Sequence, residues 1–236
     1  MAGAAGGPAP RVLGVDACPD GWVAVAPDPD RPRVYAGASI SEVLTRAALD
    51  GPPVCVGVDI PIGLPTNGSR LADLQARERL GPRRSSVFLT PVRAALEAED
   101  YAEALARQRA RTGSGCSRQA HALRTKILQV DRFRGTSEVP LLEVHPELSF
   151  ATLAGAPMAW SKKTWAGAQE RLRWLATGGL ALPADLGPDP GRAGVDDVLD
   201  AAAATWTAQR YAAGTARSWP DPPEELPDGS RAAIWA

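Results

Sequence analysis

The feature that most constrains this chain is a short local sequence that occurs twice. The first copy covers residues 12–16 and the second covers residues 54–59, and each ends in Gly-Val-Asp. Both are short apolar runs rich in β-branched residues, which is typical of buried parallel strands. Side chains alternate along a strand, so the Gly and the Asp of each copy share one face. The repeat therefore predicts two buried strands that end in carboxylates, with glycines that leave room for close packing.

The two aspartates of the repeat are predicted to lie side by side. If the strands are parallel neighbours in register, Asp16 and Asp59 lie about 5 Å apart, the spacing between adjacent strands. Carboxylates held that close repel each other, so one takes up a proton or both share a cation. Oxygen ligands favour hard cations such as Mg²⁺ or Mn²⁺. The repeat therefore predicts a metal site and, as a hypothesis, an enzyme.

The order of the segments predicts an α/β fold with a mixed five-stranded sheet and flanking helices. The five strands are expected at residues 11–17, 22–26, 33–37, 54–60 and 141–144. A Pro-Asp-Gly turn after the first strand makes the second one antiparallel to it. The later alternation of helices and strands then predicts the order 3-2-1-4-5, with strand 2 antiparallel. Residues 220–229 are expected to be a loop, and residues 232–235 are a further strand candidate.

Charge is distributed unevenly along the chain. Residues 66–134 contain 14 Arg or Lys and 7 Asp or Glu, a net charge of +7, whereas the whole chain has a net charge of −1. We expect a helical insertion over about residues 66–135 within a single domain spanning residues 11–236. A basic segment suits an anionic partner, and solvated helices on an Arg-rich chain are the alternative explanation. Residues 1–10, rich in Ala, Gly and Pro, are predicted to be a disordered tail rather than a signal peptide.

The cysteine content and the hydropathy of the chain indicate which cellular compartment to expect. The three cysteines are widely spaced and form no Cys-x-x-Cys pair, which argues against a disulfide framework and against a zinc site. This usage suits a reducing cytosol, so a cytoplasmic protein is expected. No apolar run reaches the roughly 18 residues that a membrane helix needs, so no membrane partner is expected.

A second pair of acids lies near the start of the last long predicted helix. Asp197 and Asp200 are three residues apart, which places both on one helix face together with small alanines. Such a face can approach a sheet closely, which favours an acidic cluster with Asp16 and Asp59. Two alternatives stay open. The pair also resembles a capping box, and Asp196 competes with Asp197 because it lies four residues before Asp200.

Two further candidates follow the fifth predicted strand, in the segment Glu-Val-His-Pro-Glu. His145 can serve as a metal ligand, a proton shuttle or a substrate contact, and Glu147 is a candidate acid beside it. A structural histidine near an apolar run is the alternative for His145.

Two basic pairs are candidate phosphate contacts. Lys162 and Lys163 come just before a predicted helix, and lysines at a helix N-terminus fit a phosphate site. Arg83 and Arg84 form a similar pair before two serines. For both pairs the alternative is a solvated, charged surface of an amphipathic helix.

Taken together, these segments resemble the bacterial and archaeal family called domain of unknown function 429, often described as predicted nucleases of RNase H-like fold. The matching segments are Gly14-Val15-Asp16 with Gly21-Trp22, and residues 58–64, 143–147, 161–164 and 196–201. The P-loop, Gly-x-Ser-x-Gly and His-Glu-x-x-His motifs, which mark three other enzyme classes, are absent.

The resemblance implies an RNase H-like fold and a metal-dependent chemistry. In the wider superfamily, which includes RNase H and Holliday-junction resolvases, acids from the first strand, the fourth strand and a late helix hold two Mg²⁺ or Mn²⁺ ions. Carried over by position, Asp16 corresponds to the first-strand acid and Asp59 to the fourth-strand acid. Asp197 and Asp200 correspond to the late-helix pair of the resolvases.

The function expected from the sequence is a metal-dependent nuclease with a two-metal carboxylate site, acting on DNA or RNA. The lysine and arginine pairs would hold phosphates of the nucleic-acid partner. The first alternative is a non-catalytic binding module on the same fold. The second is an actin-like or sugar-kinase ATPase, which is disfavoured because Ala17-Cys18-Pro19 follows Asp16 and offers no phosphate-binding hydroxyl.

Overall fold

The computed structural model describes residues 10–236, and one mixed β-sheet runs through it. Its strands are β1 (Leu13–Cys18), β2 (Gly21–Ala26), β3 (Arg33–Gly37), β4 (Val56–Val58), β5 (Leu141–Val144), β6 (Ser218–Glu225) and β7 (Arg231–Trp235). The tail predicted for residues 1–10 falls outside the described residues, except for Pro10. The predicted mixed α/β class is confirmed.

The sheet has seven strands in the described part of the chain, so the predicted count of five is wrong. Their order is β3-β2-β1-β4-β5-β7-β6, which keeps the predicted order of the first five. β2 is antiparallel to β1 and β3, and β1, β4 and β5 are parallel. β7 extends the sheet in parallel to β5, and β6 pairs with β7 in antiparallel orientation.

β6 forms where prolines predict a loop. Pro220, Pro222 and Pro223 all lie inside this strand. Proline lacks the N–H of a sheet ladder, but within residues 10–236 β6 is an edge strand, where one side has no neighbouring strand to bond. The pairing with β7 is also irregular between Trp219 and Glu224. An interrupted edge strand has no clear alternation of apolar and polar residues, which is why the sequence pattern does not predict it.

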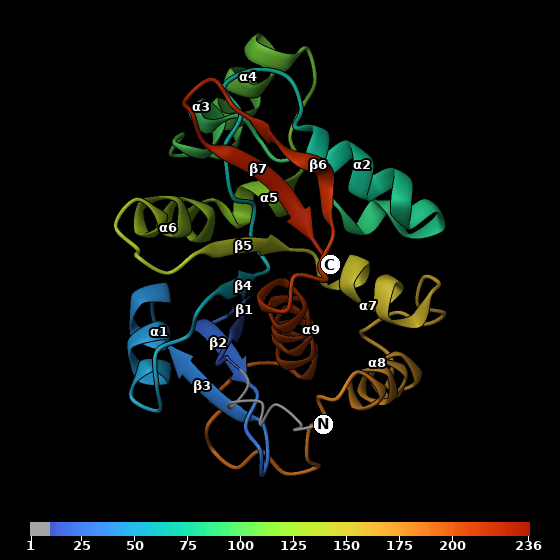
Figure 1. The fold of residues 1–236 in the computed structure, drawn as a ribbon. Helices are drawn as coiled ribbons and strands as arrows, with labels where there is room; N and C mark the ends of the chain where they lie inside the picture. Colours follow the sequence, from blue (N-terminus) through green and yellow to red (C-terminus); the bar gives the residue numbers. More distant parts are fainter. Residues whose placement is uncertain (1–9) are drawn as a thin grey trace, which may run out of the picture.

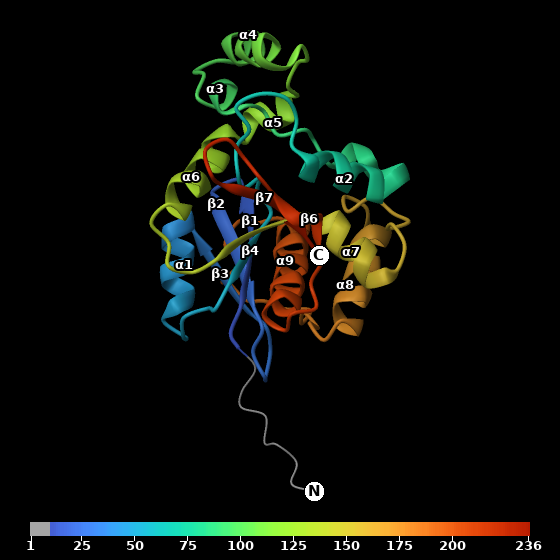
Figure 2. The same cartoon turned by 45° about the horizontal axis from the view of Figure 1, so that its top comes forward.

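Nine α-helices and one 3₁₀ helix accompany the sheet over residues 10–236. They are α1 (Ile40–Ala48), α2 (Leu71–Leu80), η1 (Gly81–Ser86), α3 (Arg93–Leu96), α4 (Tyr101–Thr112), α5 (Arg118–Ala122), α6 (Arg124–Arg134), α7 (Pro146–Ala154), α8 (Trp165–Thr177) and α9 (Val195–Ala212). Figure 1 shows α7, α8 and α9 on one side of the sheet and α1 and α6 on the other. In Figure 2, α3, α4 and α5 form a group beyond one end of the sheet. None of the helices described here is long and apolar enough to cross a membrane.

The alternation of side chains along β1 decides on which side of the sheet Asp16 lies. Leu13 and Val15 belong to the hydrophobic cluster that includes residues of α1 and α6. Gly14, between them, lies against α9. Because Asp16 is two residues after Gly14, its side chain points to the α9 side of the sheet.

Two glycines let α9 lie directly on the sheet. A Cβ atom at Gly14 would be 2.0 Å from the backbone nitrogen of Thr205, and one at Gly57 would be 2.7 Å from the carbonyl oxygen of Ala204. Real Cβ atoms do not approach other atoms so closely, so any side chain at these positions would displace the helix. The glycines of the repeat therefore bring the first turns of α9 to the edge where β1 and β4 end.

Candidate metal centre

Three carboxylates from distant parts of the chain meet at the carboxyl ends of β1 and β4. Asp16, Asp59 and Asp200 each offer one oxygen, and these oxygens all lie within 4.8 Å of one another. Val15 is in register with Val58, and the N–H of Asp59 donates to the carbonyl of Val15 at 2.9 Å, so the two strand aspartates are neighbours. Asp200 reaches them from the second turn of α9.

The donor set fits a hard divalent cation. Asp16 and Asp200 are only 7% and 1% exposed, and Oδ1 of Asp200 is buried without a hydrogen-bond partner. Oxygens on opposite sides of a cation with bonds of 2.0–2.6 Å lie about 4–5 Å apart, so one cation spans the spacing of this triad. An oxygen-only set favours Mg²⁺, Mn²⁺ or Ca²⁺ over softer metals.

Burial raises the pKa of all three carboxyl groups, and neighbouring carboxylates add to the shift. Burial is the larger cause for each group, and it raises the pKa of Asp59 and of Asp200 to about 7. The pKa of Asp16 is also raised well above its ordinary value, first by burial and then by the charges of Asp59 and Asp200. The metal-free protein therefore takes up protons at this site near neutral pH.

This shift predicts how the stability of the metal-free protein depends on pH. A carboxyl group whose folded pKa of about 7 exceeds the unfolded value of 3.8 adds stability that is fully present below pH 3.8 and is lost as pH rises through about 7. In the presence of EDTA, we expect melting at a higher temperature at pH 6 than at pH 8. Because metal binding needs ionised ligands, stabilisation by Mg²⁺ should be largest at pH 8.

The control for this prediction is Asp59→Asn, which removes one of the raised carboxyl groups. The melting-temperature difference between pH 6 and pH 8 should shrink in this variant. An unchanged difference would mean that other groups set the pH dependence.

Asp197 does not join the triad. Its side chain accepts a hydrogen bond from the backbone N–H of Gly194 at 2.9 Å, in a capping arrangement at the start of α9. Asp196, its competitor in the sequence analysis, forms an ion pair with Lys163. The capping alternative thus applies to Asp197, and the structure brings neither residue into the three-carboxylate group.

The two candidate lysines bind acids of α9. Lys162 forms an ion pair with Oδ2 of Asp200, and Lys163 forms one with Asp196. Burial lowers the pKa of Lys162, but the charges of Asp200, Asp59 and Asp16 outweigh it, so the pKa is raised and the side chain is a cation. Its ammonium group therefore lies within the electrostatic reach of the triad.

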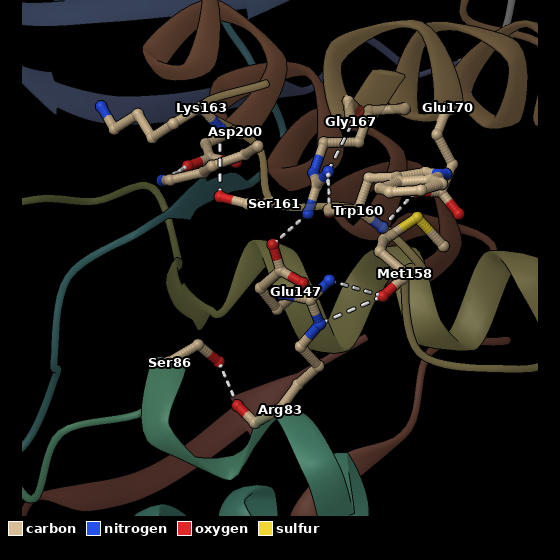
Figure 3. Close-up of polar contacts among 12 residues, drawn as sticks. Arg83, Ser86, Glu147, Met158, Trp160, Ser161, Lys163, Gly167, Glu170 and Asp200 are labelled. Atoms are coloured by element: carbon tan, nitrogen blue, oxygen red, sulfur yellow. Dashed lines mark hydrogen bonds and ion pairs between the residues drawn. The ribbon is translucent and has the colours of Figure 1, made fainter. Parts of the chain in front are cut away.

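His145 and Glu147 lie in the same cleft but outside the triad. Nε2 of His145 is 3.2 Å from the carbonyl of Ser86, and because a carbonyl can only accept, Nε2 carries the proton. Burial lowers the pKa of His145, and its Nδ1 is buried without a partner. Glu147, at the start of α7, forms an ion pair with the fully buried Arg171 (Figure 3).

The two arginines of η1 lie in different environments. Arg83 donates to the carbonyl of Met158 at 2.9 and 3.1 Å, which links η1 to the loop before α8 (Figure 3). Arg84 is exposed and does not line the cleft. Arg83 is therefore a contact across the cleft, and Arg84 is available on the surface.

Sequence reasoning missed the buried ion network behind the site. Arg70 is 1% exposed and donates to Glu143 at 2.7 Å from both of its terminal nitrogens. It also forms an ion pair with Asp73 and donates to the carbonyl of Ile62, in the loop that follows Asp59. In the sequence Arg70 is one of several arginines in a basic segment, so no pattern separates it from its exposed neighbours.

The triad opens into a polar cleft with a volume of about 520 Å³. Its walls come from the sheet edge, the loop before α8, the first turns of α9, and the segment of residues 83–90. Gln119 of α5 and Leu123 also line it, so the helical segment expected at residues 66–135 closes one side of the site. The cleft is large enough for a nucleotide-sized ligand to reach the carboxylates.

Comparison with protein families identifies the chain. A family model described as "Protein of unknown function (DUF429)" matches residues 14–225. The chain belongs to this family. Comparisons with curated proteins and with solved structures gave no match. The DUF429 membership predicted from the motifs is confirmed, and the matched span contains the three carboxylates and both lysines. The description carries no activity, so the nuclease function stays a prediction.

Proposed function

We propose that this DUF429 protein is a divalent-metal-dependent phosphodiesterase that acts on nucleic acid. The observation that carries the proposal is the convergence of Asp16, Asp59 and Asp200 on one point at the floor of an open cleft. Asp16 lies in the first strand, Asp59 directly follows the fourth strand, and Asp200 lies in the last long helix. Together with the strand order, this arrangement supports an RNase H-like fold as part of the proposal.

The residues of the cleft have separate roles in this proposal. Asp16, Asp59 and Asp200 would hold Mg²⁺ or Mn²⁺, which supplies Lewis-acid activation of a water and of a phosphoryl oxygen when bound. Lys162 presents a cation beside Asp200, where it would attract the phosphate of the substrate. Burial lowers the pKa of His145, so its neutral ring presents an unpartnered Nδ1 that can accept a hydrogen bond.

The basic helical segment supplies the nucleic-acid contacts in this proposal. Arg84 is exposed on η1, at the side of the cleft formed by residues 83–90. Phosphate contacts release counterions, so affinity for nucleic acid should fall steeply as salt rises. Arg84→Ala should reduce the slope of log affinity against log salt by about 1.

The experiment tests binding and cleavage of single-stranded, duplex and branched DNA and RNA at low salt. We expect cleavage with Mn²⁺ or Mg²⁺ and none with EDTA, and Asp59→Asn should lose cleavage while keeping binding. Arg31→Ala is the control for the salt slope, because Arg31 is exposed in the loop at the other end of β2 from the cleft. If the protein neither binds nor cuts any of these substrates, the proposal fails and a non-catalytic binding module becomes the better explanation.

A further inference from the structure

The charges at the metal centre limit how many cations it can hold. The inference drawn from them rests on the proposed function. Three carboxylates meet at the site, and Lys162 binds one of them through Oδ2 of Asp200. The second oxygen of Asp200, Oδ1, is buried and has no hydrogen-bond partner. The same carboxylate therefore holds a resident cation on one oxygen and leaves the other free for a ligand.

The other acids of the cleft each have an ion-pair or hydrogen-bond partner outside the triad. Glu143 and Asp73 share Arg70, Glu147 pairs with Arg171, Asp196 pairs with Lys163, and Asp197 accepts from the backbone N–H of Gly194. Each of these carboxylates is therefore engaged away from the triad. What is left is the triad, which carries three negative charges when its carboxyl groups are ionised for metal binding, and Lys162, with one positive charge. The remaining charge of −2 matches one divalent cation.

The geometry also limits the number of cations. Sites that hold two metals keep them about 3.5–4 Å apart and need carboxylates on both sides of the pair. The sequence analysis expects Asp197 to supply the fourth carboxylate, but its side chain caps α9 instead. The ammonium of Lys162 lies beside the triad and supplies the positive charge that a second cation would otherwise supply.

Lys162 is presented by a loop that is held on several sides. Glu170 accepts from the backbone N–H groups of Ala159 and Trp160 at 2.9 and 3.1 Å. Arg83 binds the carbonyl of Met158, and Thr164 caps α8 just after the lysines. Figure 3 shows Glu170 beside Trp160 and Arg83 beside Met158 on this loop. A loop fixed in this way keeps Lys162 at the triad as a built-in part of the site.

We propose that this centre takes a single divalent cation, and that the ammonium of Lys162 supplies the second positive charge toward the substrate phosphate. The site thus differs from the two-metal arrangement expected from the sequence. One cation on Asp16, Asp59 and the free oxygen of Asp200, together with Lys162, makes the centre neutral before substrate enters.

The test measures Mn²⁺ binding to the full chain by isothermal titration calorimetry and by electron paramagnetic resonance. Wild type should bind one Mn²⁺. Lys162→Met, with the opposing ammonium removed, should bind Mn²⁺ at least about tenfold more tightly at pH 8, because no positive charge beside Asp200 then repels the cation. Despite that tighter binding, its cleavage should fall at least about a hundredfold. Lys162→Arg should keep the wild-type affinity for Mn²⁺. Lys163 pairs with Asp196 instead, so Lys163→Met should change the affinity for Mn²⁺ by less than about threefold.

The outcomes separate this inference from the proposed function. Two Mn²⁺ ions in wild type would overturn the single-cation site while leaving metal-dependent cleavage intact. Unchanged Mn²⁺ affinity in Lys162→Met, or tighter binding with full cleavage, would overturn the role of Lys162. If neither wild type nor Lys162→Met binds Mn²⁺, the proposed metal centre itself is wrong. A circular dichroism melt of each variant, with Lys162→Gln as a second variant, guards against loss of fold.

Discussion

Asp16→Asn should abolish the response of this protein to divalent cations without weakening its fold. The asparagine keeps an oxygen that can accept from the N–H of Ala17, as Oδ1 of Asp16 does at 2.7 Å. It removes a carboxyl group whose pKa is raised first by burial and then by the charges of Asp59 and Asp200, so the metal-free protein should be equally stable or more stable. Cleavage should fall at least about a hundredfold, because loss of even an outer-shell partner of a metal ligand costs 10–100-fold.

The measurement combines melting curves with and without Mg²⁺ and an assay of cleavage. In wild type, Mg²⁺ should raise the melting temperature by mass action, and in Asp16→Asn this shift should vanish. Asp197→Asn is the matched control, since Asp197 lies in the same cleft but caps α9. It should keep the Mg²⁺ shift. An equal Mg²⁺ shift in wild type and Asp16→Asn would count against the proposed ligand set.

The second large effect is expected on stability, from Arg70→Met. Arg70 is buried and binds Glu143, Asp73 and two backbone carbonyls. Its removal leaves two carboxylates buried without their cation, and breaking a buried ion pair from one side costs about 3–5 kcal/mol. Because the network holds the loop after Asp59, the metal site should also loosen.

Urea unfolding at pH 7 measures the expected loss of unfolding free energy. Arg109→Met, on an exposed position of α4, is the control and should change stability by less than about 0.5 kcal/mol. Arg70→Lys should recover only part of the loss, because an ammonium cannot bind Glu143 through two parallel hydrogen bonds. A loss below about 1 kcal/mol for Arg70→Met would show that the network does not hold this part of the fold.

The centre of the sheet and two of the site's acids can be predicted from the sequence for a physical reason. Buried parallel strands consist of apolar β-branched runs, and the repeat of Gly-Val-Asp adds a register marker to two of them. Gly14 pairs with Gly57 in the sheet, as the repeat implies. The same glycines explain why the helix that carries Asp200 lies on this face.

The rest of the site depends on contacts between distant residues that no local pattern encodes. Asp196, Asp197 and Asp200 have the same chemistry, and only their positions around α9 decide that Asp200 joins the triad. The lysines bind acids that follow them by more than 30 residues. At the sheet edge, β6 is specified by pairing with β7 rather than by its own proline-rich sequence.

Anomalous diffraction from crystals soaked in Mn²⁺ tests the central claim most directly, because it locates the cation and its ligands independently of any substrate. We expect one Mn²⁺ peak with oxygens of Asp16, Asp59 and Asp200 at about 2.0–2.6 Å, and Lys162 still bound to Asp200. Crystals of Asp16→Asn grown and soaked in the same way should lack the peak. The account would be contradicted by wild-type crystals with no Mn²⁺ at the triad, or with Mn²⁺ held by Asp196 and Asp197 instead.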